Sequence, residues 1–480
     1  LTSDYLNDFY MPAVNGGLAG MNDDGKYYGV SQTITGEIVN PLAQIQGTKG
    51  YTKEDKITGN MYLTLGDETW KGFKFTTRAS IDVANQLNSY WTPTSWYSSE
   101  RNNTATNTNK NYNTWSTWMW ENYVSYDKTI GEKHNIAAVL GMSSTEYTHI
   151  WNNSTSSPMA IQGDAFAEHG DSQREGNVAG NSQITRQTSY FGRVSYDYDG
   201  KYLVQAIMRR DGTSMLHPDQ KWGTFPSVSA GWIASNEDFW NIDLIDFFKV
   251  RASWGLNGML SSLSPDQYRS LITFDGLQYP DATGGFYSGA EPALLSNPEL
   301  TWASSEQIDI GFDMYMLGDK LTLGFDYFNK KTKDLLTTGT PPLSVGNTPS
   351  TVNAGDVTNK GVEIELGYRN YDNEFKYGIS ANMTFLKNEV SYLNPLVDRI
   401  GGASVGTGWT ATWFELGQPV WYFRGYETNG IFQNQAQVDA YKEANGGLAG
   451  YDPVPGDPIV VNTNGDELIN EEDQTNIGNP

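Results

Sequence analysis

The residues best suited to hold a metal ion lie near the end of the chain. Segment 462–473 approximates a twelve-residue calcium loop, in which oxygen ligands recur at fixed positions. The spacing assigns six ligands: Asn462, Asn464, Asp466, the carbonyl of Leu468, Asn470 and Asp473. Asn stands at the first position, Glu467 at the usual glycine position, and Asp instead of Glu at the last. We therefore expect weak Ca²⁺ binding, with a solvated Asn/Asp-rich loop as the alternative.

A second candidate site is the aromatic segment 90–97, which reads Tyr-Trp-Thr-Pro-Thr-Ser-Trp-Tyr. The rings of Trp91, Trp96 and Tyr97 could stack on the faces of sugars or hold a peptide. The alternative is that these rings pack in an aromatic girdle or against a lid. The sequence leaves both interpretations open.

Residue patterns typical of enzymes are missing. The four histidines show no zinc-type spacing, and no nucleophile elbow occurs. Glu363 and Glu365 lie two apart on one expected strand, where they line a wet surface rather than form an acid–base pair. We predict that the protein is not an enzyme and requires no cofactor, with Ca²⁺ as the one candidate.

Composition excludes several other classes. The 480 residues include 32 Lys+Arg and 56 Asp+Glu, which gives a formal net charge of −24 and argues against a nucleic-acid partner. Cysteine is absent, so neither disulfides nor Cys-based metal sites can form. Aromatic residues make up 13% of the chain, which argues against disorder. No run approaches the roughly 18 consecutive apolar residues of a transmembrane helix.

The elements that must position these residues are strands, because apolar and polar residues alternate along most of the chain. Several of these runs reach ten residues or more, which suits a tilted strand that crosses a bilayer. The expected strands are 57–65, 73–83, 115–126, 134–142, 189–198, 201–210, 222–235, 248–256, 304–316, 321–329, 361–369 and 375–385.

Connection lengths also alternate. Short turns are expected at Asp199-Gly200, 317–320 and 370–373, and long polar segments at 85–114, 143–187, 258–302 and 335–357. Short turns at one end and long loops at the other are typical of outer-membrane barrels. The sequence therefore predicts an all-β fold, a large antiparallel transmembrane β-barrel with long extracellular loops. A large secreted β-protein that binds glycans is the alternative, because alternation does not say which face meets water.

Several ordered motifs carry a family resemblance, which is strongest from about 186 to 390. They include Ser189-Tyr-Phe-Gly-Arg-Val-Ser-Tyr-Asp-Tyr198, Arg209-Arg-Asp-Gly-Thr213, Asn297-Pro-Glu-Leu-Thr-Trp302 and Asn353-Ala-Gly-Asp-Val-Thr-Asn-Lys-Gly-Val-Glu363. With these motifs the chain resembles the SusC/RagA family of TonB-dependent outer-membrane transporters.

The resemblance implies a 22-stranded barrel in the bacterial outer membrane, in contact with its lipid and filled by an N-terminal plug. It implies import of oligosaccharides or peptides past a SusD-like surface lipoprotein, driven by the TonB–ExbB–ExbD complex acting through the plug. A passive outer-membrane porin remains an alternative.

The expected organisation has three parts. Residues 1–56 form a loop and an early barrel segment, 57–426 the strands with their extracellular loops, and 427–480 an extracellular loop with the calcium-like segment. The chain begins at Leu1 and ends in a loop-like composition, so we expect a fragment whose plug domain and last strands lie outside this sequence.

Overall fold

A computed structural model describes the chain at residues 49–66, 68–92, 95–96, 102–103, 105–156, 177–260, 263–270, 272–273, 278–280, 284–292, 296–338, 351–372, 374–394, 399–406, 409–445, 452–466 and 468–479. By their contacts these residues divide into two compact units. One holds the described parts of 1–64, 76–122 and 143–187, and the other those of 65–75, 123–142 and 188–480.

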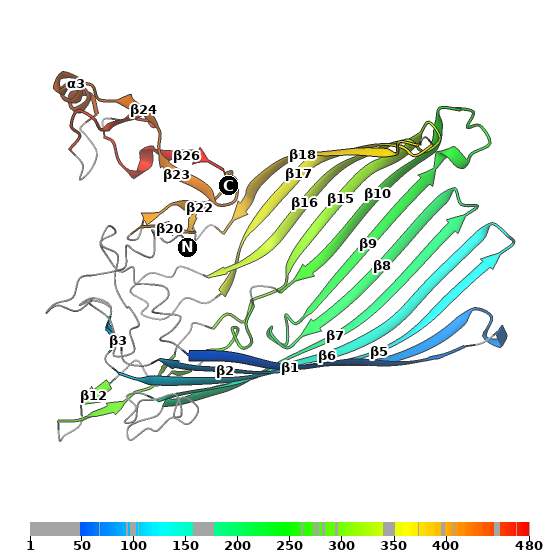
Figure 1. Cartoon of the computed structure of the whole chain (residues 1–480), viewed down its shortest axis with the longest axis horizontal. Coiled ribbons are helices and arrows are strands. Elements are labelled where there is room, and N and C mark those ends of the chain that lie inside the picture. Colours follow the sequence, from blue (N-terminus) through cyan, green and yellow to red (C-terminus); the bar gives the residue numbers. More distant parts are fainter. Residues whose placement is uncertain are drawn as a thin grey trace. The chain divides into compact units, whose positions relative to one another are not determined.

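Twelve of the described strands form one antiparallel sheet in the order β1-β2-β5-β6-β7-β8-β9-β10-β15-β16-β17-β18 (Figure 1). Their bounds are β1 Lys49–Leu65, β2 Phe73–Thr92, β5 Asn107–Ile130, β6 His134–Ser156, β7 Asn177–Tyr198, β8 Tyr202–Thr213, β9 Trp222–Ile233, β10 Ile245–Met259, β15 Ala303–Met316, β16 Leu321–Thr338, β17 Thr351–Asn370 and β18 Tyr377–Leu393. Each corresponds to one of the twelve strands expected from the alternation, so the all-β prediction is confirmed.

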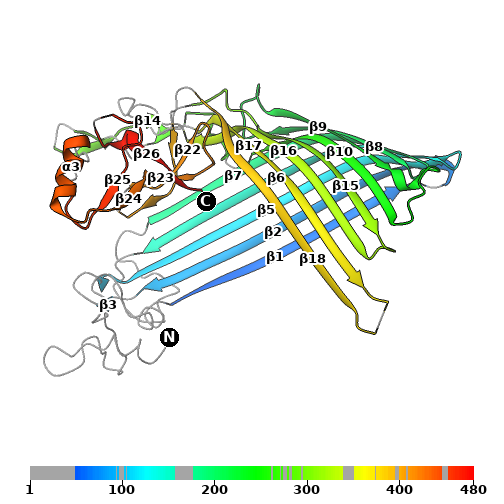
Figure 2. The ribbon, with the colours of Figure 1, turned by 90° about the horizontal axis from the view of Figure 1, so that it is seen from above.

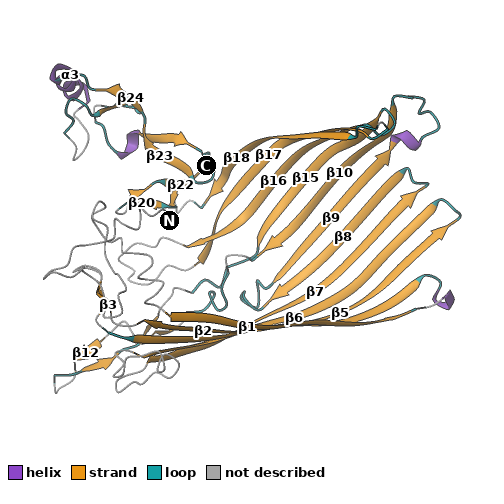
Figure 3. Cartoon of the chain, viewed as in Figure 1, coloured by secondary structure: helices purple, strands orange, loops and turns teal. Residues whose placement is uncertain are grey.

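The remaining described elements are short, and strands dominate throughout (Figure 3). Two-stranded pairs join β3 (Ser95–Trp96) to β4 (Asn102–Asn103), β11 (Ile272–Thr273) to β14 (Glu291–Pro292), and β12 (Gln278–Pro280) to β13 (Phe286–Ser288). Single 3₁₀ turns lie at η1 (Glu68–Trp70), η3 (Ala234–Asn236) and η5 (Glu471–Asp473). Within the described ranges, no helix has the length and apolar character needed to cross a membrane.

The large sheet has two chemically different faces. In β8, Tyr202, Val204, Ala206 and Met208 are exposed while the residues between them are half-buried. The strand registers continue this pattern over β10, β15, β16 and β17, because Val250 lies opposite Phe312, and Leu323 lies opposite Leu366. We call the side that bears these residues the apolar face and the opposite side the polar face. A large exposed apolar surface marks contact with a membrane or a partner.

The short turns end the strands as expected. Asp199 and Gly200 both have positive φ angles, 57° and 63°, as a type I′ hairpin requires. The turn between β9 and β10 carries Glu237, which accepts hydrogen bonds from the Tyr202 hydroxyl, Trp232 Nε1 and Lys201 Nζ. These hydrogen bonds, with that from Tyr202 the strongest, hold the pKa of Glu237 below its usual value of 4.5.

The far ends of the strands correct the expected loop boundaries. Much of the predicted loop 85–114 is strand, since β2 continues to Thr92 and β5 begins at Asn107. Strand structure also enters the predicted loops 143–187 and 335–357 at both ends. The reason is that the strands continue beyond the apolar region, where polar residues replace the alternation on which the prediction relied.

Beyond Leu393 the chain forms smaller structures. A four-stranded sheet joins β19 (Arg399–Gly401), β22 (Thr412–Glu415), β23 (Tyr422–Tyr426) and β26 (Gln474–Gly478). Two hairpins pair β20 (Ser404–Val405) with β21 (Trp409–Thr410), and β24 (Thr428–Ile431) with β25 (Pro458–Val460). Helix α3 (Gln435–Asn445) lies beside β25, where the Tyr441 hydroxyl donates to the Val460 carbonyl (Figure 2). The three-part division of the chain stays a prediction.

A small core joins this region to the large sheet. Val357, Val390, Leu393 and Phe414 are buried together, so β17 and β18 pack against the residue of β22 that faces them. Gly355 is required here, because a Cβ at this position would lie 2.9 Å from the Tyr392 carbonyl oxygen and 3.1 Å from the Phe414 ring.

Candidate functional site

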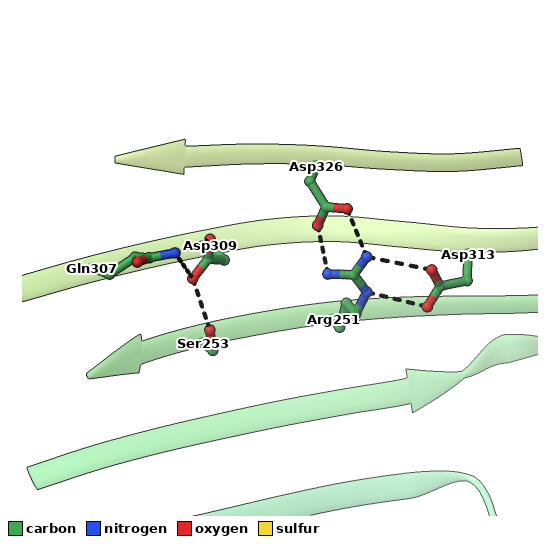
Figure 4. Close-up of polar contacts among 6 residues, drawn as sticks. All are labelled: Arg251, Ser253, Gln307, Asp309, Asp313 and Asp326. Atoms are coloured by element: carbon green, nitrogen blue, oxygen red, sulfur yellow. Dashed lines mark hydrogen bonds and ion pairs between the residues drawn. The ribbon is translucent and has the colours of Figure 1, made fainter. Parts of the chain in front are cut away.

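The polar face of β10, β15 and β16 carries a group of charged and hydrogen-bonding side chains. They alternate with the apolar residues of the same strands, because successive side chains of a strand point to opposite faces. Six of them are drawn in Figure 4: Arg251, Ser253, Gln307, Asp309, Asp313 and Asp326.

Arg251 binds two aspartates on the neighbouring strands (Figure 4). Its Nε and Nη2 atoms donate to Asp313 at 3.1 and 3.3 Å, and its Nη1 and Nη2 atoms donate to Asp326 at 2.5 and 2.7 Å. The planar guanidinium matches both carboxylates in a bidentate way. We call these three residues the Arg251 cluster, and it retains one net negative charge.

A glycine makes this contact possible. Gly311 lies between the strands of Arg251 and Asp326 and is the register partner of both residues. A Cβ at Gly311 would lie 2.3 Å from Asp326 Oδ1 and 2.4 Å from the Phe325 carbonyl oxygen. The missing side chain therefore lets Arg251 reach across β15 to β16.

Asp309 forms a second polar contact on the same face. It lies directly opposite Ser253 and accepts a hydrogen bond from Ser253 Oγ at 3.2 Å. Gln307 Nε2 donates to both oxygens of Asp309, at 2.9 and 3.1 Å. These bonds hold the Asp309 carboxylate in place while its remaining lone pairs can accept from a ligand.

The polar face is hollowed beside these residues. A cavity of about 610 Å³ is lined by Arg251, Ser253 and Asp309 together with small residues such as Ser229 and Gly231. A second hollow of about 350 Å³ is lined by Asp313, Thr322, Glu365 and Arg369, among others. Small side chains keep space free in front of the fixed charges.

Further carboxylates extend this surface onto β17. Glu363 lies directly opposite Asp326, and Glu365 lies opposite Gly324. Both glutamates are exposed. With Asp309, Asp313 and Asp326 they make this part of the polar face rich in hydrogen-bond acceptors. Such a surface can bind hydroxyl, amide or cationic groups of a polar ligand.

Sequence reasoning predicted the wet surface around Glu363 and Glu365 but missed the Arg251 cluster. Along the chain, Arg251 lies 62 residues from Asp313 and 75 residues from Asp326. Only the register of the strands brings them together. An arginine on the polar side of a predicted strand was the one signal available.

The predicted aromatic contacts lie in different settings. Trp91, in the penultimate position of β2, is 7% exposed, so little of its ring is open for stacking. The backbone of Trp96 pairs with that of Asn102 in the short pair β3–β4. Tyr97 lies outside the described residues. Substrate contact by these residues stays a prediction.

The calcium-like loop is organised by its own hydrogen bonds. Asn462 Oδ1 accepts from the Gly465 N–H, Asn464 Oδ1 from the Asp466 N–H, and Asp466 Oδ1 from the Leu468 N–H. Glu467 lies outside the described residues.

The last predicted ligand, Asp473, is fully buried and accepts from the N–H groups of Thr463 and Asn470. Asn470 caps η5 by accepting from the Glu472 N–H. Among the described residues, no group of three or more His, Cys, Asp or Glu side chains could hold a metal ion. The predicted ligand set has only two carboxylates, which fits weak binding at most. Calcium binding stays a prediction.

The fold and its faces define a class of protein. An antiparallel sheet of long strands, apolar and exposed on one side and polar on the other, is the structure of a transmembrane β-barrel. Comparisons with known proteins agree. The family model described as "TonB dependent receptor-like, beta-barrel" matches residues 2–465.

The chain therefore belongs to the TonB-dependent receptor-like β-barrel family, and it is an outer-membrane protein. It is 29% identical over 483 residues to TonB-dependent receptor P26 of Formosa agariphila, covering 96% of this chain and 46% of that protein. It is 32% identical over 216 residues to TonB-dependent receptor SusC of Bacteroides thetaiotaomicron, covering 44% of this chain and 21% of that protein.

A solved structure shares the fold. The structure of the RagAB peptide transporter aligns with a TM-score of 0.74 at 20% sequence identity, covering 90% of this chain and 48% of that one. The matches to TonB-dependent receptors P26 and P3 cover 96% of this chain, which spans about half the length of those relatives. The predicted SusC/RagA resemblance is confirmed.

Proposed function

We propose that the protein imports oligosaccharides or peptides across the outer membrane by TonB-dependent transport. The match to the receptor family over residues 2–465 is the observation that carries this proposal. The polar face supports it, because the Arg251 cluster, Asp309 and the adjoining cavity offer fixed hydrogen-bonding groups to a polar cargo. In this mechanism the groups bind cargo transiently and change no covalent bond.

The partners follow from the same proposal. A SusD-like surface lipoprotein would deliver cargo at the extracellular end, and TonB–ExbB–ExbD would supply energy through the plug of the longer polypeptide. Similarity to a TonB-dependent receptor named SusC and to a structure titled as a peptide transporter supports both partners and the peptide class of cargo. The acceptor-rich polar face suits both classes, since sugars and peptides alike donate hydrogen bonds.

The test uses the full-length protein in its own bacterium. Labelled oligosaccharide and peptide mixtures are supplied to the parent strain, to a strain lacking the gene, and to a strain lacking TonB. We expect uptake of one mixture to fall to background in both deletion strains and to return when the gene is restored.

Two outcomes would replace this proposal. Uptake that needs the gene but continues without TonB would identify a passive porin. A protein that leaves the outer membrane on washing with high salt would be a secreted binding protein.

A further inference from the structure

A set of hydrogen-bonded polar side chains covers one end of β1, β2, β5 and β6, which are neighbours in the sheet in this order. It lies on the side opposite to the exposed apolar residues Ile57, Trp118 and Ile150, because successive side chains of a strand point to opposite faces. We call this set the amide strip. Its members are Thr52, Glu54, Gln86, Asn88, Asn109, Asn111, Asn113, His149 and Thr155.

One half of the amide strip joins β1 to β2. The Thr52 hydroxyl donates to Asn88 Oδ1 at 2.8 Å, and Asn88 Nδ2 donates to Gln86 Oε1 at 2.9 Å. Gln86 Nε2 in turn donates to Glu54 Oε2 at 3.0 Å. All donors in this chain point the same way and the chain ends at a carboxylate, so each amide is held in one orientation.

The other half joins β5 to β6. Asn113 Nδ2 donates to Asn111 Oδ1 at 2.9 Å, and His149 Nε2 lies 3.2 Å from Asn113 Oδ1. Asn109 Nδ2 donates to Thr155 Oγ1 at 3.1 Å. The amides of β5 are therefore fixed as well.

The two halves lie side by side. On the opposite side of the sheet, the Thr114 hydroxyl donates to Asn85 Oδ1 at 2.9 Å between β5 and β2. In antiparallel strands the next pair along, Gln86 and Asn113, is then level. The amide strip crosses four strands, and three spacings of about 4.8 Å make about 14 Å. This width suits a short polymer better than a single small molecule.

The amide strip lies on the extracellular side of the hydrocarbon. Asn88 lies fifteen residues after the start of β2 at Phe73, and Asn113 lies seventeen residues before the end of β5 at Ile130. A tilted strand crosses the hydrocarbon in about 9–11 residues. The connections at Phe73 and Ile130 are short, and short turns are periplasmic in such barrels. A ligand from outside the cell therefore reaches the amide strip before the rest of the wall.

The amide strip keeps hydrogen-bonding capacity for a ligand. A primary amide has two N–H groups, and in the described part of the chain each of these amides donates at most one side-chain hydrogen bond. Their side chains are half-buried and so remain within reach. The nine members include one carboxylate and no Lys or Arg. An acidic ligand is therefore disfavoured.

Aromatic rings flank the amides on the same side. Tyr90 follows Asn88 by two residues and is 46% exposed. A Cβ at Gly50 would lie 2.5 Å from Tyr90 Cδ1, so the ring lies over the backbone of β1. Trp115 follows Asn113 by two residues and stacks on His149, with ring centres 5.2 Å apart and planes inclined by 10°. Fixed amides thus alternate with fixed rings.

We propose that the amide strip, with Tyr90 and Trp115, binds a neutral oligosaccharide. Sugar hydroxyls both donate and accept hydrogen bonds, as side-chain amides do, and flat rings match the C–H faces of the sugar. A peptide is commonly bound at a sheet edge or in an apolar groove, whereas the amide strip presents polar side chains on the face of paired strands. This inference rests on the proposed import function and selects one of its two cargo classes.

The test is isothermal titration calorimetry with the full-length protein in nanodiscs. The probes are the linear hexaoses of glucose, galactose, mannose and xylose, hexagalacturonic acid, and a mixture of hexapeptides. Asn113→Leu removes the hydrogen bonds to Asn111 and His149, and Trp115→Leu removes the ring. Asn85→Leu is the matched control, because Asn85 also accepts a side-chain hydrogen bond but lies on the opposite side of β2.

We expect at least one neutral hexaose to bind the parent and the control equally. Binding by each test variant should be about tenfold weaker, because each loses about one hydrogen-bonding or stacking interaction. Thermal melting shows which variants are folded. Asn88→Leu, in the other half of the amide strip, replaces any β5 variant that folds poorly.

Three results would overturn the inference. They are no binding of any neutral hexaose, equal affinities in the parent and the folded test variants, and tighter binding of the hexapeptides or of hexagalacturonic acid. Binding is measured without TonB, so its outcome is separate from that of transport. Hexaose binding without uptake would refute import and keep the saccharide site, whereas TonB-dependent uptake of the hexapeptides alone would keep import and refute the site.

Discussion

Substitution of Gly311 by alanine tests the geometry of the Arg251 cluster. The new Cβ would lie 2.3 Å from Asp326 Oδ1 and 2.4 Å from the Phe325 carbonyl oxygen. Side-chain rotation could relieve the first contact, but the second involves backbone in a paired strand and needs a strand shift. Overpacking of this kind costs about 1–3 kcal/mol.

Two smaller effects nearly cancel. Arg251 and Asp326 are 36% and 24% exposed, so losing their contact costs only about 1 kcal/mol after solvent screening. Replacing a strand glycine with alanine gains about 0.5–1 kcal/mol through the unfolded state. The net expectation is a loss of about 2 kcal/mol in the free energy of unfolding.

The assay is urea unfolding of the full-length protein in detergent micelles, followed by tryptophan fluorescence. Gly324→Ala is the matched control, because Gly324 lies on the neighbouring strand β16 and on the same face as Gly311. A Cβ at Gly324 would lie 3.6 Å from Glu365 Cβ, which is an ordinary van der Waals contact. We expect the control to unfold as the parent does or slightly later. Equal unfolding of Gly311→Ala and Gly324→Ala would refute the argument that an empty position at 311 lets Arg251 reach Asp326.

Three further predictions concern other parts of the chain. Asp466→Ala should abolish any calcium-dependent rise in melting temperature, and a parent protein that melts identically with calcium and with chelator would end the calcium hypothesis. The pKa of Glu237 is lowered from 4.5 on folding, so its contribution to stability is full above about pH 4.5 and disappears as the pH falls through the lower, folded value. Glu237→Gln should therefore flatten the stability profile in this acidic range, and an unaltered profile would contradict the assignment. The predicted aromatic contacts are Trp91, Trp96 and Tyr97. If they bind cargo, alanine at each position should reduce uptake without reducing the amount of folded protein. A loss of folded protein together with uptake would indicate that the ring has a packing role.

The twelve strands were predictable because lipid imposes a strict rule on each of them. Every second residue must be apolar where a strand crosses hydrocarbon, so the pattern from Phe375 to Phe385 is visible without knowledge of any neighbour. The extracellular ends of β2 and β5 were not predicted, because this rule does not apply outside the hydrocarbon. Water meets both faces of a strand there, and the sequence is no longer constrained to alternate.

The Arg251 cluster was unpredictable for a different reason. Which carboxylates Arg251 reaches depends on the registers of β10, β15 and β16, and a shift of one residue would turn Asp313 and Asp326 to the other face. The role of Gly311 depends on the same registers. Local sequence contains no information on these pairings, although it does show which side of each strand is polar.

Charged groups bracket the apolar face, with Lys201 and Glu237 at the short turns and Lys331 and Lys360 ten residues from the short-turn ends of β16 and β17. Any movement of the sheet along the membrane normal would drag one of these sets into hydrocarbon, at a cost of about 2–4 kcal/mol for each lysine brought to the bilayer midplane. These two sets of charges therefore oppose a change in the position of the barrel along the membrane normal. If the proposed TonB complex pulls from the periplasmic side, the barrel would keep its position in the membrane. The pulling force would then act on the proposed plug inside the barrel and not displace the barrel.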